Sequence, residues 1–137
     1  MKQGLFADYI KKLKTAFTYF VNRFILFIFA ANSQAMIVEY EKEFLRELYE
    51  TGKCTNKKYR FQRQVVAKYQ KRIDTLIAAT RKEDLFVFNS LNFEALANDF
   101  FSIRIDYHYR LEFKLHEREG EPVLTVCTVT DITNHYH

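Results

Sequence analysis

Residues 101–116, FSIRIDYHYRLEFKLH, alternate without a break between apolar or aromatic and polar side chains. Strict alternation with a period of two is the pattern of a half-buried β-strand. Sixteen residues are too many for one ordinary strand, so the stretch is predicted to fold into a hairpin that turns near residues 106–108. A loop of three or five residues preserves the alternation and places Arg104 opposite Arg110 on the polar face.

This arrangement of two arginines breaks a local rule of sheet formation. Like charges directly opposite one another destabilise a pair of strands. Functional sites are where such conflicts are expected, because an anion between the two guanidinium groups would resolve this one. The polar face, with Arg104, His108, Arg110 and Lys114, is therefore predicted to bind RNA phosphate. The alternative is that the arginines form ordinary surface ion pairs with Asp106 and Glu112.

Length and composition indicate one globular domain. The chain has 137 residues, of which 48% are hydrophobic and 28% charged, and its three glycines and one proline leave little room for linkers. Cys54 and Cys127 match no metal-ligand or paired-cysteine spacing, so they are predicted to be free thiols in a reducing compartment. We expect a cytoplasmic protein with no metal and no cofactor.

Residues 1–35 differ from the rest of the chain. They hold five basic residues against the single acid Asp8, which accounts for the whole net charge of +4, and they include the apolar run 24–31. A transmembrane helix is disfavoured because Asn22 and Arg23 interrupt the apolar run. Three interpretations stay open: a leader peptide, a real amphipathic helix, and an upstream segment from a misassigned start with Met36 as the natural first residue. We exclude residues 1–35 from the predicted fold.

The remaining pattern predicts an α+β domain over residues 36–137. Residues 36–40 indicate a short edge strand, residues 41–50 an amphipathic helix that stops at Gly52, and residues 57–79 a longer helix. The β-branched run 123–132 is typical of a strand in the middle of a sheet. Two N-terminal helices are therefore predicted to pack on one face of a small antiparallel β-sheet.

Two further segments connect these elements. Residues 85–99 are ambiguous and are predicted to hold a short strand or extended piece, followed by a loop or one helical turn. Residues 117–122 are predicted to form a turn around Gly120.

A basic stripe precedes the hairpin. Between Lys53 and Arg72 the chain carries eight Lys or Arg residues and no acidic residue. One interpretation is a solvated helix face, and the other is a surface for nucleic acid or an acidic partner. Arg60, Arg63 and Lys71 are the predicted phosphate-binding residues of this stripe.

The residues suited to catalysis lie near the C-terminus. All four histidines occur after residue 107, and the chain ends in His135, Tyr136 and His137. Cleavage of RNA requires a base for the 2′-hydroxyl, an acid for the 5′-oxygen and a positive charge for the phosphorane, which His, Tyr and Arg can supply. A frayed, solvated tail is the alternative for the last residues.

From Met36 onward the chain resembles the HigB branch of the RelE/HigB toxin superfamily, the plasmid-maintenance killer proteins. The resemblance rests on three stretches in family order: MIVEYEKEFLRELYETGK at 36–53, SIRIDYHYRLEF at 102–113 and the terminal Tyr136-His137. It implies a ribosome-dependent mRNA endonuclease (mRNA interferase) that arrests growth, neutralised by a HigA-like helix-turn-helix antitoxin.

The resemblance also implies roles for individual residues. Arg104 and Arg110 match the hairpin arginines, and Tyr136 and His137 match the terminal catalytic pair, so the catalytic set is predicted to be Arg110, His135, Tyr136 and His137. The family's loop with a catalytic His and Lys is replaced here by LNFEALAND at 91–99. Two alternatives remain: a toxin of the same fold that only binds its target, and a membrane-associated protein whose basic helix in residues 1–35 lies on anionic lipid.

Overall fold

The computed structural model describes residues 7–18, 20–22 and 35–134. The chain divides into two compact units, Met1–Gln34 and Ala35–His137. In the first unit, residues 7–18 and 20–22 are helical. No helix in the described part of the chain is both long enough and apolar enough to cross a bilayer. The interpretation of residues 1–35 as a misassigned start stays a prediction.

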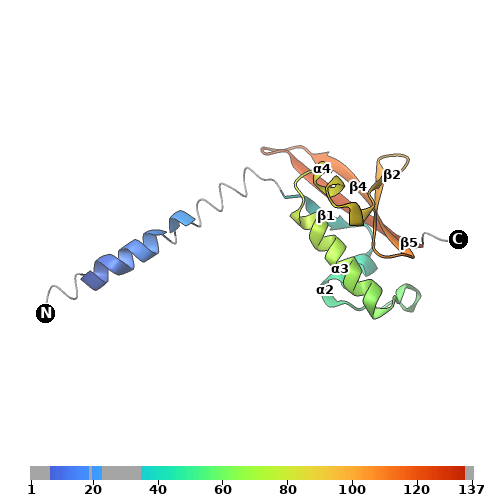
Figure 1. Ribbon diagram of the computed structural model, residues 1–137, viewed down its shortest axis with the longest axis horizontal. Helices are drawn as coiled ribbons and strands as arrows, with labels where there is room; N and C mark the ends of the chain where they lie inside the picture. The colour runs from blue at the N-terminus through green and yellow to red at the C-terminus, as the bar shows by residue number, and fades with distance from the viewer. Residues whose placement is uncertain (1–6, 19, 23–34, 135–137) are drawn as a thin grey trace. The chain divides into compact units, whose positions relative to one another are not determined.

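The second unit is an α+β domain, as predicted (Figure 1). Its single sheet has the strand order β1-β5-β4-β3-β2. Three α-helices, α2, α3 and the short α4, lie between β1 and the other strands along the chain. The described elements are β1 (Ile37–Tyr40), α2 (Glu43–Thr51), α3 (Arg63–Ala78), α4 (Glu83–Phe86), β2 (Glu94–Ala95), β3 (Phe100–Arg104), β4 (Tyr109–Arg118) and β5 (Leu124–Asn134).

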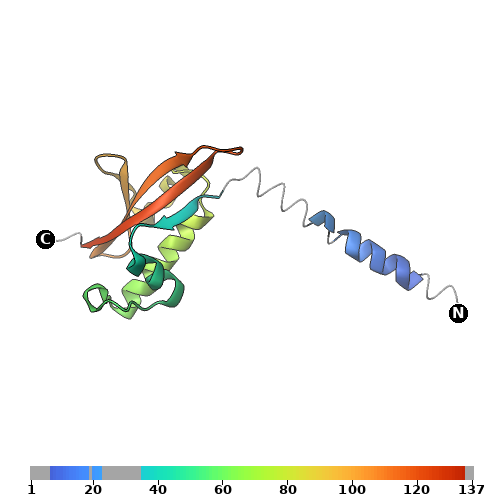
Figure 2. The same ribbon diagram turned by 180° about the vertical axis from the view of Figure 1, so that it is seen from behind.

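The sheet is mixed, so the prediction of an antiparallel sheet is wrong for one strand. β1 forms the predicted edge strand, but it pairs in parallel with β5, with Ile37 opposite Val126 (Figure 2). The consecutive strands β2 to β5 are joined by short connections and run antiparallel. No turn constrains the direction of β1, because the helices α2, α3 and α4 separate it from the other strands along the chain.

The hairpin of residues 101–116 forms in the predicted register. Arg104 pairs with Arg110 and Ile103 with Leu111, and residues 105–108 connect β3 to β4. The turn is closed by the carboxylate of Asp106, which accepts hydrogen bonds at 2.8 Å from the backbone N–H groups of His108 and Tyr109. A short side chain that binds its own backbone in this way is a common device of tight turns.

β5 lies between β1 and β4, which confirms the prediction of an interior strand. A bulge at Thr130 interrupts its pairing with β4, because Val129 lies opposite Phe113 whereas Asp131 lies opposite Glu112. An extra residue in one strand shifts the alternation of side chains beyond it. As a result, β5 continues with Thr133 opposite Arg110.

The helices differ from their prediction mainly at one end. α2 stops at Gly52 as predicted, and the glycine adopts the left-handed conformation with φ of 71°. α3 begins only at Arg63, because residues 57–59 form a separate 3₁₀ turn capped by the side chain of Asn56. In the ambiguous segment 85–99 the order is the reverse of that predicted, since the helical turn α4 precedes the short strand β2.

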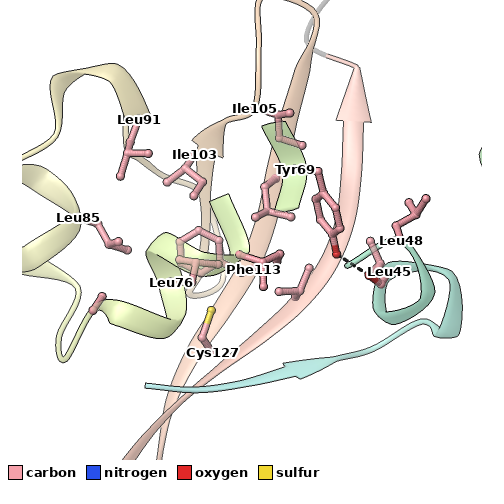
Figure 3. Close-up of a cluster of buried hydrophobic side chains, with 14 of the residues drawn as sticks. Leu45, Leu48, Tyr69, Leu76, Leu85, Leu91, Ile103, Ile105, Phe113 and Cys127 are labelled. Atoms are coloured by element: carbon pink, nitrogen blue, oxygen red, sulfur yellow. Dashed lines mark hydrogen bonds between the residues drawn. The ribbon is translucent and has the colours of Figure 1, made fainter. Parts of the chain in front are cut away.

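The core lies between the apolar side of the sheet and the helices (Figure 3). Phe113 and Ile103 from the hairpin are fully buried, as are Tyr69 of α3 and Leu45 of α2. The hydroxyl of Tyr69 donates a hydrogen bond of 2.7 Å to the carbonyl of Leu45, which joins the two helices inside the core. The apolar positions of the alternating stretch thus supply one wall of the core.

We predict that Gly52→Ala lowers the free energy of unfolding by about 1 kcal/mol, because a side chain disfavours the left-handed conformation at the end of α2. Gly120→Ala is the matched control, since its Cβ would meet only the carbonyl of Pro122 at an ordinary 3.5 Å. Urea denaturation followed by circular dichroism measures both. Equal effects of the two substitutions would contradict this account.

Candidate functional site

Arg104 and Arg110 project from the same face of the sheet, opposite the core. They form a directly opposed pair in the β3–β4 register, and paired residues share a face. Their environments nevertheless differ. Arg104 is exposed, whereas Arg110 retains only 5% of its surface. The pair is therefore one buried cation beside one solvated cation.

The guanidinium of Arg110 is held by groups of the protein itself. Its Nε donates to the Ser102 hydroxyl at 2.9 Å, and its Nη2 donates to the carbonyl oxygens of Asn92 at 2.7 Å and Ser102 at 3.3 Å. Its Nη1 lies 3.5 Å from the Glu94 carboxylate and makes no hydrogen bond. The predicted ion-pair partner, Glu112, is replaced by Glu94.

These contacts offset the repulsion between the two arginines within the protein, and phosphate binding by this face stays a prediction. Burial lowers the pKa of Arg110 from its ordinary value and the charge of Arg104 acts in the same direction, while Glu94 opposes both. The repulsion is offset by Glu94, by two carbonyl oxygens and by the exposure of Arg104. Arg110 is thus a structural cation in this conformation, and Arg104 is the arginine that solvent and ligands reach.

The partners of Arg110 come mainly from a segment in which the sequence pattern is weak. Glu94 belongs to the two-residue strand β2, where it pairs with Ser102. Asn92, whose carbonyl binds Arg110, adopts φ of 43°, a left-handed conformation that costs energy outside glycine. Among these partners of Arg110, only Ser102 could be predicted from the sequence, because the alternation of residues 101–116 places it on the same face as Arg110.

The end of β5 lies beside this arginine. Thr133 pairs with Arg110, and Asn134 pairs with Tyr109. The predicted catalytic residues His135, Tyr136 and His137 lie outside the described residues, and their roles stay predictions. The register therefore places Thr133 and Asn134, the last described residues, beside the arginine pair.

The other predicted residues of the hairpin have different environments. His108 is exposed in the turn, and its ring makes an edge contact with Tyr107 at a centroid distance of 5.2 Å. The ammonium of Lys114 lies 4.3 Å from the ring centroid of Phe100, a cation–π contact on the same face as the arginines. The register places Lys114 opposite Phe100, two same-face pairs away from Arg104 and Arg110.

The basic stripe is only partly helical. Arg60 lies in extended backbone after the 3₁₀ turn, and Arg63 is the first residue of α3. Both are exposed. Arg60 therefore lies outside α3 whereas Arg63 belongs to it, which corrects the prediction of a single basic helix over residues 57–79.

Lys71 belongs to a groove that sequence reasoning did not find. A depression of about 390 Å³ separates α3 from the tip of the hairpin. Arg72 links α3 to the hairpin across this depression, because its Nε donates to the carbonyl of Arg104 at 2.7 Å. We call this depression the basic groove, and its lining residues are Lys68, Lys71, Arg72, Arg104, Ile105, Asp106 and Tyr107.

The cysteines and acidic residues do not form a second site. Cys54 and Cys127 are free thiols, as predicted, and burial raises the pKa of Cys127 to about 12, so it stays protonated at neutral pH. Within the described ranges, no three His, Cys, Asp or Glu side chains are grouped as metal ligands. No protein-family model and no curated protein matches this chain, so the resemblance to RelE/HigB toxins stays a prediction.

The two arginines provide a matched pair of substitutions. We predict that Arg110→Ala lowers the free energy of unfolding by roughly 2 kcal/mol, because hydrogen bonds from a buried charged group are lost and Glu94 is left without its cation. Arg104→Ala should change stability by no more than about 0.5 kcal/mol, since its side chain is exposed. Urea denaturation tests both, and equal losses would show that Arg110 is not a structural cation.

Proposed function

We propose that residues 36–137 form the toxin of a type II toxin–antitoxin module, a ribosome-dependent mRNA endonuclease. The carrying observation is the placement of Arg104 opposite Arg110, with the end of β5 pairing beside Arg110. The order of one strand, the helices α2, α3 and α4, and an antiparallel run of strands supports a RelE-like arrangement. Under this proposal the protein acts in the cytoplasm on ribosome-bound mRNA.

In the proposed reaction, the 2′-hydroxyl of the RNA attacks the adjacent phosphate and the 5′-oxygen leaves. A base takes the proton of the 2′-hydroxyl, and an acid returns a proton to the departing 5′-oxygen, which gives a 2′,3′-cyclic phosphate and a free 5′-hydroxyl. His135, Tyr136 and His137 are the proposed acid and base groups. Arg104 is the exposed cation available to stabilise the phosphorane.

The division of roles between the arginines follows from their burial. Arg110 is buried and hydrogen-bonded to Ser102 and Asn92, so we assign it to holding the polar face in place. Arg104 is assigned to phosphate contact. This assignment moves the phosphate-binding role from the pair as a whole to its exposed member.

The basic groove is the proposed track for the rest of the RNA backbone. Lys71 and Arg72 each lie one helical turn from Lys68 on α3, where like charges weaken a helix unless an anion binds them. Tyr107 is 68% exposed at the rim of the groove and offers an aromatic surface for base stacking. Cations interleaved with an exposed aromatic ring are typical of single-stranded nucleic-acid surfaces.

A toxin that binds its target without cleaving RNA is the second candidate. It is favoured by one observation: the Nε and Nη2 donors of Arg110 already bind Ser102 and Asn92, and the whole side chain is buried. In that case the same face would engage the ribosome, and the helix-turn-helix antitoxin would still neutralise the protein.

We predict that inducible expression of the full chain arrests growth and that the neighbouring reading frame, expressed with it, restores growth. Arg104→Ala should relieve the arrest, whereas Arg46→Ala, an exposed arginine of α2 paired with Glu43, should not. Mapping of mRNA 5′-ends separates the candidates: new ends that depend on Arg104 support cleavage, and arrest with intact messages supports the binding-only toxin. Absence of arrest from the full chain and from a chain starting at Met36 would contradict both.

We also predict that the basic groove sets the salt dependence of RNA binding. Each lysine that neutralises a phosphate contributes about 0.7 to the slope of log K against log salt for single strands. Lys68→Gln and Lys71→Gln should each reduce the slope by about that amount, measured by fluorescence anisotropy with a single-stranded oligoribonucleotide. Lys82→Gln, at the N-cap of α4, is the control and should leave the slope unchanged. Equal slopes for all three variants would show that the RNA backbone does not bind along the groove.

A further inference from the structure

The helical part of the first unit has one apolar face that is open to solvent. Tyr9, Leu13, Phe17 and Phe20 follow one another at intervals of four, four and three residues, which places them on the same side of a helix. Their exposed fractions are 60%, 48%, 69% and 68%. Large apolar side chains grouped on one helix face, rather than scattered singly, mark a surface that another body covers.

The remaining side of the same helix is basic. Lys11, Lys12 and Lys14 are exposed, and Asp8 is the only acidic residue among residues 1–35. The hydroxyl of Thr15 donates to the carbonyl of Lys11 at 2.9 Å, so it is engaged with the backbone. The helix therefore combines an aromatic face with a lysine face.

This combination favours one kind of occupant for the apolar face. Two copies of the helix would bring surfaces of the same positive charge together, whereas an anionic bilayer attracts the lysines and accepts the apolar face at the headgroup boundary. Phe and Leu are side chains that interfacial helices insert at that boundary, and the Tyr9 ring adds a hydroxyl that can stay at the headgroups. A helix that spans the membrane is not indicated, since no described helix is long and apolar enough to cross a bilayer.

We propose that the helical residues 7–18 and 20–22 bind the surface of an anionic membrane, lying in its plane with Tyr9, Leu13, Phe17 and Phe20 toward the acyl chains. The lysines of the opposite face and its borders contact the lipid headgroups. A short isolated helix is marginal in water, so the bilayer also stabilises the helical conformation. This inference does not depend on the proposed function of residues 36–137.

The absence of tryptophan from the chain permits a clean experiment. Tyr9→Trp in the full chain introduces a single reporter at the apolar face. With vesicles of phosphatidylcholine and phosphatidylglycerol, we expect a blue shift of its emission and co-sedimentation of the protein, both weakened by added salt. Vesicles of phosphatidylcholine alone should bind the protein several-fold more weakly, because the attraction to the lysines is missing.

Two adjacent substitutions in the same reporter chain separate the faces. Phe17→Asp and Thr18→Asp change the net charge equally, but only Phe17 belongs to the apolar face. We expect Phe17→Asp to weaken binding to the anionic vesicles by more than about tenfold, and Thr18→Asp to retain most of it. Circular dichroism of both variants confirms that the second unit stays folded.

Three outcomes would overturn the proposal. The first is equal binding to both vesicle types, which would leave the lysines without a role. The second is equal loss from Phe17→Asp and Thr18→Asp, which would show that the aromatic face does not enter the lipid. The third is a failure to bind either vesicle, with a concentration-dependent increase in mass that Phe17→Asp abolishes, which would make a second copy of the chain the occupant.

Discussion

The register of the β3–β4 hairpin is set by the burial of its apolar side. Ile103, Leu111 and Phe113 are fully buried on one face. A slip of one residue in either strand would turn that strand's apolar side chains to solvent and bring polar ones into the core. The packing of the core therefore excludes such a slip, and the observed register places Arg104 against Arg110. The electrostatic conflict on the outer face is a direct consequence of the packing on the inner face.

The protein resolves such conflicts with a charge from outside the opposed pair. Glu94 of β2 approaches Arg110 to 3.5 Å, while Arg104 extends into solvent. The same arrangement recurs with opposite sign next to it, where Glu112 lies opposite Asp131 and Lys42 binds Asp131 at 2.8 Å. In both cases a residue distant in the chain neutralises one member of a like-charged pair. Each of these two pairs on the sheet face therefore has one member in an ion pair.

Arg104 connects this sheet face to the basic groove. Its side chain belongs to the opposed pair, and its carbonyl accepts the hydrogen bond from Arg72 that joins the hairpin to α3. Any change that moves the end of β3 consequently alters both the arginine pair and the wall of the groove. This connection is the physical reason to treat the two surfaces as parts of one candidate site. Because Arg110 has a structural role, its substitution affects the fold as well as the chemistry of this face.

Period-two alternation over residues 101–116 determined the hairpin, its loop and the opposition of the two arginines, because alternation depends only on which side chains are apolar. Gly52 determined the end of α2 in the same local way. Three features came from tertiary structure alone: the parallel pairing of β1, the start of α3 at Arg63, and Glu94 and Asn92 as partners of Arg110. Each depends on contacts between residues far apart in the chain, for which local pattern carries no information. The sequence thus established which residues share a face, and packing decided which of two identical arginines is buried.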